Sequence, residues 1–131
     1  MIERLTYEHR TARMCGGVDI EIWVKDGKLY YNKTPFIIDF ESDNFAENAE
    51  SAVTIEEFEK KLAKLNIEEW EKVSLPPKDI VYCDGSDWTV KVKYEGQKEL
   101  KREGENAYPA NWDKFIKLLR LTVGKFEKIT F

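Results

Sequence analysis

The sequence predicts an α+β domain in which an antiparallel sheet built from hairpins has two main helices packed on one face. Three observations support this class. Several short segments alternate polar and apolar residues, tight turns separate them at 26–27 and 95–97, and residues 54–65 and 110–121 have an amphipathic helical pattern. Strands joined by tight turns pair antiparallel, and amphipathic helices bury their apolar side against such a sheet. The length of 131 residues predicts a single domain spanning 1–131.

The composition indicates a chain that folds around its own core. Hydrophobic residues make up 42% and aromatic residues 13% of the sequence. A disordered chain is poor in aromatic residues, and a chain of this length can bury an adequate core without disulfides or metals. The N-terminus lacks the pattern of a secretory signal, and no apolar run approaches the length of a membrane span. We therefore expect a soluble protein of the cytoplasm without membrane contact.

The first hairpin follows from alternation and turn chemistry. Residues 19–25 alternate polar and apolar side chains, and Asp26 with Gly27 supplies the positive φ angles of a type I′ turn. A two-residue loop places Trp23 opposite Tyr30, on the face with polar neighbours.

A third strand is predicted over 36–40, followed by an acidic segment, 41–53, that has little periodicity and is expected to be a loop with at most a helical turn. Thr54 begins the first helix, since Thr54 and Glu57 have the spacing of a capping box. Asn66 is expected to end it in a left-handed conformation, with a second short helix over the next six residues.

The second hairpin requires a choice of register. Residues 88–94 alternate cleanly after a strand predicted at 80–82. A three-residue loop at 95–97 places Val92 opposite Leu100, whereas a two-residue loop would place it opposite a charge. Register follows the hydrophobic pattern, so we expect the longer loop.

The second helix is predicted over 110–121, with apolar residues at i, i+3, i+4 and i+7. Gly124 is expected to end it, and residues 125–131 can add a final strand.

Residues 84–112 contain the pattern D-G-x-x-W-x-V-x-V-x-Y followed by G-x-N-A-Y-P-x-N-W. It resembles a pattern in small bacterial proteins of a family of unknown function, over residues 67–119. The resemblance implies an intracellular bacterial α+β protein. In physical terms the second half of the pattern indicates a structural role, because Pro109 favours helix entry and Asn106 or Asn111 can bond to free N–H groups there.

Residue types typical of catalysis are scarce. The chain has one histidine, His9, expected to be exposed on a strand, and two distant cysteines, Cys15 and Cys83, expected to be inert thiols. They form neither a disulfide framework nor a Cys-x-x-Cys pair, and the common catalytic motifs do not occur. We therefore predict no catalytic residue and no cofactor. The alternative is a small enzyme that uses carboxylates in a cleft between sheet and helix.

The charge distribution is uneven. Residues 39–59 contain eight acids and no lysine or arginine, whereas the whole chain has a net charge of -4. Such a segment is either an ordinary solvated surface or a negative surface for a basic partner. The second interpretation predicts a protein-binding module of the immunity-protein or inhibitor type, whose partner is a toxin, a nuclease or a nucleic-acid-binding protein. Direct nucleic-acid binding is not expected, because acids interrupt the basic residues at 91–102.

Two aromatic residues complete the predicted interface. Trp23 and Tyr30 would anchor a protein partner or a self-dimer if they are exposed, unless Phe126 or Phe131 covers them. The predicted partner-binding residues are Asp39, Glu41, Asp43, Glu47, Glu50, Trp23 and Tyr30.

The same acids suggest a weaker alternative. Residues 39–50 place acids at positions 1, 3, 5, 9 and 12 of a calcium loop. Asn44 stands where such a loop has glycine, and the preceding segment is predicted to be a strand rather than a helix. No metal site is predicted in the main interpretation, and the calcium candidates are Asp39, Glu41, Asp43 and Glu50.

Overall fold

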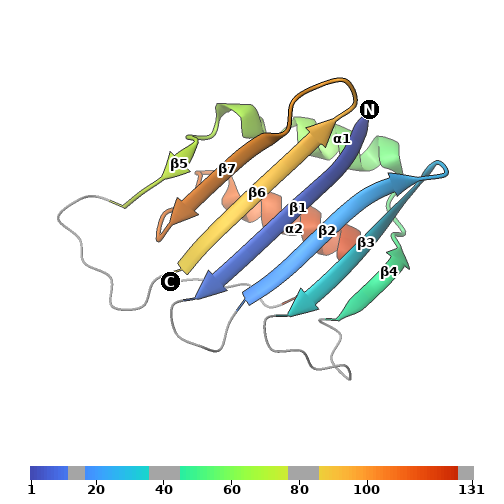
Figure 1. The fold of residues 1–131 in the computed structure, drawn as a ribbon, viewed down its shortest axis with the longest axis horizontal. Helices are drawn as coiled ribbons and strands as arrows, with labels where there is room; N and C mark the ends of the chain where they lie inside the picture. The colour runs from blue at the N-terminus through green and yellow to red at the C-terminus, as the bar shows by residue number, and fades with distance from the viewer. Residues whose placement is uncertain (12–16, 36–44, 77–85, 127–131) are drawn as a thin grey trace.

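The computed structural model describes residues 1–11, 17–35, 45–76 and 86–126. They form a seven-stranded, mostly antiparallel sheet of order β4-β3-β2-β1-β6-β7-β5, with both helices behind it in Figure 1. The predicted α+β class is confirmed. The strands are β1 (Ile2–Thr11), β2 (Gly17–Lys25), β3 (Lys28–Pro35), β4 (Ala46–Glu50), β5 (Val73–Ser74), β6 (Ser86–Tyr94) and β7 (Leu100–Glu105). The helices are α1 (Ile55–Ala63) and α2 (Trp112–Val123), with a 3-10 turn, η1 (Ile67–Glu69).

Both predicted turns are present. Asp26 and Gly27 have φ angles of 51° and 76°, and β2 pairs with β3 so that Trp23 lies opposite Tyr30. The pairing of β6 with β7 places Val92 opposite Leu100, as the longer loop requires. The central strand β1 pairs antiparallel with β2 and β6 and so joins the two hairpins into one sheet.

The predicted loop at 41–53 is wrong in part, because residues 46–50 form β4. This strand pairs with the edge of β3, placing Ala49 opposite Tyr31 and Glu50 opposite Tyr30. Alanine and glutamate are poor strand formers, so the strand depends on backbone pairing with β3 rather than on its own sequence. The strands predicted at 36–40 and 80–82 lie outside the described residues. Of the strand predicted at 125–131, residues 127–131 also lie outside them, and Lys125 and Phe126 are not in a strand.

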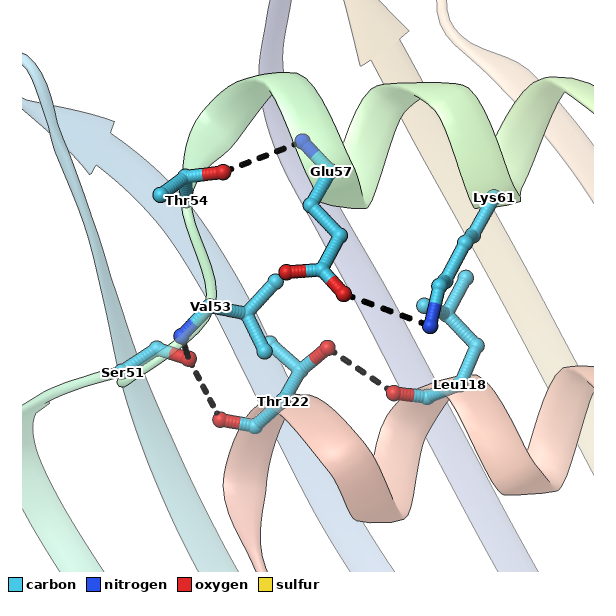
Figure 2. Close-up of polar contacts among 7 residues, drawn as sticks. All are labelled: Ser51, Val53, Thr54, Glu57, Lys61, Leu118 and Thr122. Carbon is cyan, nitrogen blue, oxygen red and sulfur yellow. Dashed lines mark hydrogen bonds and ion pairs between the residues drawn. The ribbon is translucent and has the colours of Figure 1, made fainter.

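The start of α1 is the predicted one, and it is tied to α2 (Figure 2). Thr54 Oγ1 accepts a hydrogen bond of 3.1 Å from the Glu57 amide, and the Glu57 carboxylate forms an ion pair of 3.3 Å with Lys61. Ser51 Oγ donates to the Thr122 carbonyl over 2.7 Å, linking the end of β4 to α2.

The other helix boundaries differ slightly from the prediction. Asn66 has the expected left-handed φ of 48°, but the turn after it, η1, covers three residues rather than six. The second helix begins and ends two residues later than predicted, and Gly124 follows it with a φ of 79°. Asn111 occupies its N-cap position without a side-chain cap bond, because its amide binds the Trp70 indole and the Leu65 carbonyl instead.

The core lies between the helices and the sheet and is rich in aromatic rings. The rings of Trp88 and Trp112 are 4.6 Å apart, and Trp70 and Phe115 pack around them. Gly104 on β7 provides space for this cluster, since a Cβ there would lie 2.5 Å from Trp88 Nε1. Neither helix of the described segments is long and apolar enough to span a membrane.

Candidate interaction surface on the open face of the sheet

The strands bury alternate side chains against the helices and present the others on the opposite face. On β2, Ile20 and Ile22 are buried, whereas the intervening Glu21 and the following Trp23 are only partly buried. Figure 1 shows no helix or strand of the described segments over this second face. We call it the open face.

Trp23 and Tyr30 form an aromatic pair on the open face. Their rings are stacked at 6.3 Å between centroids with an interplanar angle of 25°, and both side chains are partly exposed. Phe126 does not cover them, because it is buried on the helix side, 6.4 Å from the Tyr7 ring. Phe131 lies outside the described residues.

The strand register extends this pair into a row across the sheet. Glu50 lies opposite Tyr30, Tyr30 opposite Trp23, and Trp23 opposite Arg4. Directly opposed residues of antiparallel strands project from the same face. The structure therefore brings Glu50, Tyr30 and Trp23 together, and Glu47 lies exposed on the same edge strand. Asp39, Glu41 and Asp43 lie outside the described residues.

The two described acids of β4 differ in their electrostatic surroundings. Glu50 forms an ion pair of 3.1 Å with Lys28, whose pKa is raised by the hydrogen bond and charge of that carboxylate. Glu47 has no ion-pair partner among the described residues. Glu47 is therefore the more available of the two for an external cation.

Trp23 also forms one wall of a hollow of about 450 Å³ on the open face. Its other lining residues are Glu3, Arg4, Glu21 and Lys93. Arg4 lies 4.0 Å from Glu99, and Lys93 Nζ donates to the carbonyls of Tyr94 and Gln97.

Both cations of the hollow thus have partners within the chain, whereas Glu3 and Glu21 have no ion pair among the described residues. The hollow can accept a cationic side chain beside the Trp23 ring, with a carboxylate for its charge and an aromatic surface for its stem. Sequence reasoning did not identify these two acids as site residues. The signal was available for Glu21 alone, which precedes Trp23 by two residues and so shares its face.

His9 is buried, at 1% exposure, which corrects its predicted exposure. It alternates in phase with Leu5 and Tyr7 and therefore faces the helices. Burial, with a smaller effect of the Arg10 charge, lowers the His9 pKa to about 4. The Tyr7 hydroxyl lies 2.5 Å from Nδ1 and the Tyr108 hydroxyl 3.4 Å from Nε2.

This chain of hydrogen bonds ends at Ser86, which binds the Tyr108 hydroxyl and is itself 1% exposed. Burial raises the pKa of both Tyr7 and Tyr108. Ser86 and His9 are buried and find their hydrogen-bond partners within the chain, whereas Tyr108, which joins them, is partly exposed. Cys15 and Cys83 lie outside the described residues.

A second cleft bears on the enzyme alternative. It has a volume of about 490 Å³, runs between η1 and the loop before α2, and includes Glu69, Glu71 and Tyr108 in its lining. Both glutamates are exposed, and none of the carboxylates that the structure describes is buried. The enzyme alternative, which expects carboxylates in a cleft between sheet and helix, stays a prediction.

The basic residues at 91–102 do not share one face. Arg102 is 8% exposed and points towards the helix side, where it donates to the carbonyls of Trp70 and Glu68. Lys91 and Lys101 lie opposite each other on the open face, and Lys101 is 3.5 Å from Glu103. Arg102 is therefore buried in the core and is not part of the basic strand face considered for nucleic-acid binding.

The calcium hypothesis is not tested, since three of its four candidates lie outside the described residues. The fourth, Glu50, is the partner of Lys28. Within the described segments, no three His, Cys, Asp or Glu residues cluster as a metal site would require.

Comparison with protein-family models, with curated proteins and with solved structures found no match for this chain. The family resemblance over residues 67–119 stays a prediction. The surface described above is therefore the basis for inferring a function.

Proposed function

We propose that this chain is a non-catalytic protein-binding module of the immunity-protein or inhibitor type, which acts in the cytoplasm and contacts a basic partner through its open face. The contact surface consists of Trp23, Tyr30 and Glu21 with the acids of β4, Glu47 and Glu50. Asp39, Glu41 and Asp43, which precede this strand in the sequence, are proposed as part of the same surface. Both helices are taken to cover the other face, so that the open face is left for the partner.

The observation that carries the proposal is the stacked, partly exposed Trp23–Tyr30 pair, flanked by Glu50 and by Glu21, which has no ion pair among the described residues. Aromatic anchors with a polar rim are the residues that supply most of the binding energy at protein interfaces. Flanking carboxylates accelerate encounter with a basic protein and select against acidic ones.

The partner's contact would centre on the hollow beside Trp23. A lysine or arginine of the partner can lie against the indole ring and pair with Glu21, since Arg4 and Lys93 are engaged elsewhere. A cation over a tryptophan face contributes roughly 0.5–2 kcal/mol, more as water is excluded.

The experiment is affinity capture from the cells that produce the protein, with charge-reversal variants as bait. We expect a basic protein to be captured by the wild type and lost with Glu21→Lys/Glu47→Lys. The matched control is Glu68→Lys/Glu71→Lys, which makes the same charge change at exposed positions away from the open face. Circular dichroism establishes that each bait is folded.

Capture that is retained by Glu21→Lys/Glu47→Lys, or lost equally with both double variants, would contradict the proposal. In the first case the open face is not the contact surface. In the second case only net charge matters.

A further inference from the structure

The two helices form a groove on the side of the molecule opposite the open face. Figure 2 shows α1 running from Thr54 to Lys61 beside α2, which runs the opposite way from Leu118 to Thr122. Between α2 and the end of α1, with the two residues that follow it, lies a groove of about 600 Å³.

The floor of this groove is apolar. Leu65 and Leu118 are each 4% exposed and lie at its base, whereas Leu121 is 48% exposed at its side. Since Leu65 and Leu118 belong to the core, the apolar surface that the groove exposes comes mainly from Leu121 and from the aliphatic stems of the lining lysines. The groove therefore offers apolar surface in a recess rather than on a ridge.

The rim is positively charged throughout. The lining residues include Lys61, Lys64, Lys114, Lys117 and Arg120, and none of them is acidic. On α2 the rim lysines and floor leucines fall at positions 114, 117, 118 and 121, the i, i+3, i+4, i+7 spacing of one helix face.

Among the described residues, two of the five cations have partners and three have no carboxylate partner. Lys61 pairs with Glu57, and Arg120 donates to the Phe126 carbonyl while its guanidinium stacks 5.3 Å from the Phe126 ring. The remaining three, Lys64, Lys114 and Lys117, have no carboxylate partner in the part of the chain that the structure describes. A concentration of positive charge in a chain of net charge -4 indicates an anionic occupant.

The shape of the groove favours a protein segment over a membrane. Membrane-surface helices insert a protruding apolar face below the headgroups. Here Leu65 and Leu118 are buried in a hollow lined by five cations, and Leu121 is the one large hydrophobic residue exposed on α1 or α2. A recess with a charged rim instead accepts an apolar ridge flanked by acids.

We infer that the α1–α2 groove binds an amphipathic helix of a partner protein, with an apolar ridge against Leu121 and the lysine stems beside it, and Asp or Glu residues against Lys64, Lys114 and Lys117. Binding of a helix in a groove through apolar anchors at i, i+3, i+4 and i+7 is a recurrent mode of recognition. This second site is independent of the proposed open-face contact, from which the sheet separates it.

The test uses a fluorescein-labelled peptide of about 18 residues, five helical turns, with leucine at the anchor spacing and glutamate at the flanking positions. Fluorescence anisotropy measures its affinity for the wild type and for Lys114→Glu/Lys117→Glu. We expect the double variant to bind at least about tenfold more weakly, and added salt to weaken wild-type binding. The control Lys72→Glu/Lys98→Glu carries the same charge change at exposed positions outside the groove and should bind as the wild type does.

Leu121→Ser separates the apolar contribution from the ionic one and should also weaken binding, because it removes an anchor contact without changing charge. Failure of the wild type to bind the peptide, or equal affinities of wild type and Lys114→Glu/Lys117→Glu, would overturn the inference. It would also be overturned if phosphatidylserine vesicles bound the wild type and the peptide did not, or if light scattering showed that the groove is filled by a second copy of the chain.

Discussion

Lowering the pH from about 7 to about 5 should destabilise the protein through His9. The imidazole is 1% exposed, with Tyr7 and Tyr108 at its two nitrogens and the Trp112 ring 6.2 Å from its centroid. Charging it would place a cation in this core beside Arg10. Burial, and to a smaller extent the charge of Arg10, lower the His9 pKa to about 4.

The direction in which the free energy of unfolding changes with pH follows from proton uptake. An unfolded histidine titrates near its ordinary value of about 6.5, so between that pH and about 4 the unfolded chain binds a proton that the folded protein does not. Stability is therefore fully present above the unfolded pKa and is lost as the pH falls through this window. The whole shift corresponds to about 3 kcal/mol, of which about 2 kcal/mol is lost between pH 7 and 5.

Urea unfolding followed by tryptophan fluorescence measures this loss, and His9→Asn supplies the control. Asparagine keeps a polar atom near the position of Nδ1 for Tyr7 but does not titrate. The carboxylates contribute almost equally to both proteins, so the difference in unfolding free energy should change by about 2 kcal/mol over the interval. If wild type and His9→Asn lose the same stability, His9 is not held neutral in the folded state and the account of this core is wrong.

Two further predictions concern the sheet–helix packing. Gly104→Ala should lower the free energy of unfolding by about 2–4 kcal/mol, because the new Cβ would lie 2.5 Å from Trp88 Nε1 and must displace a buried indole. An unchanged urea midpoint would show that the indole can move freely. Arg102→Met should cost about 2–3 kcal/mol by leaving the Trp70 carbonyl and one other carbonyl without their donor. Equal stability of Arg102→Met and wild type would mean that water replaces the guanidinium at no cost.

The hairpins were predictable because their signals are local. Asp26-Gly27 determines the turn, and the two-residue loop then determines that Trp23 meets Tyr30. The same holds for Val92 and Leu100, where one register satisfies the apolar pattern and the other does not. In both cases the information lies within about a dozen residues.

The features that depend on contacts distant in sequence were not predictable. The strand at 46–50 has no strand pattern of its own and exists because the edge of β3 pairs with it, which is also what places Glu50 beside Tyr30. The hollow beside Trp23 requires Arg4 from β1 and Lys93 from β6, strands far apart in the sequence.

His9 is an intermediate case. The alternation of Leu5, Tyr7 and His9 is visible in the sequence and would have placed the histidine inside, but charged neighbours on both sides made the strand seem exposed. The burial of His9 follows only from the position of β1 at the centre of the sheet, because a central strand has one face against the helices along its whole length.

The central claim is that Trp23 and Tyr30 meet the partner, and hydroxyl-radical footprinting of the free protein and its complex tests this most directly. Both side chains are partly exposed and should be oxidised in the free protein, whereas Trp88 and Trp112 are buried and should react slowly. The account predicts that bound partner protects Trp23 and Tyr30 and leaves the oxidation of exposed Met1 unchanged. Equal oxidation of Trp23 and Tyr30 in the free and bound protein would contradict it.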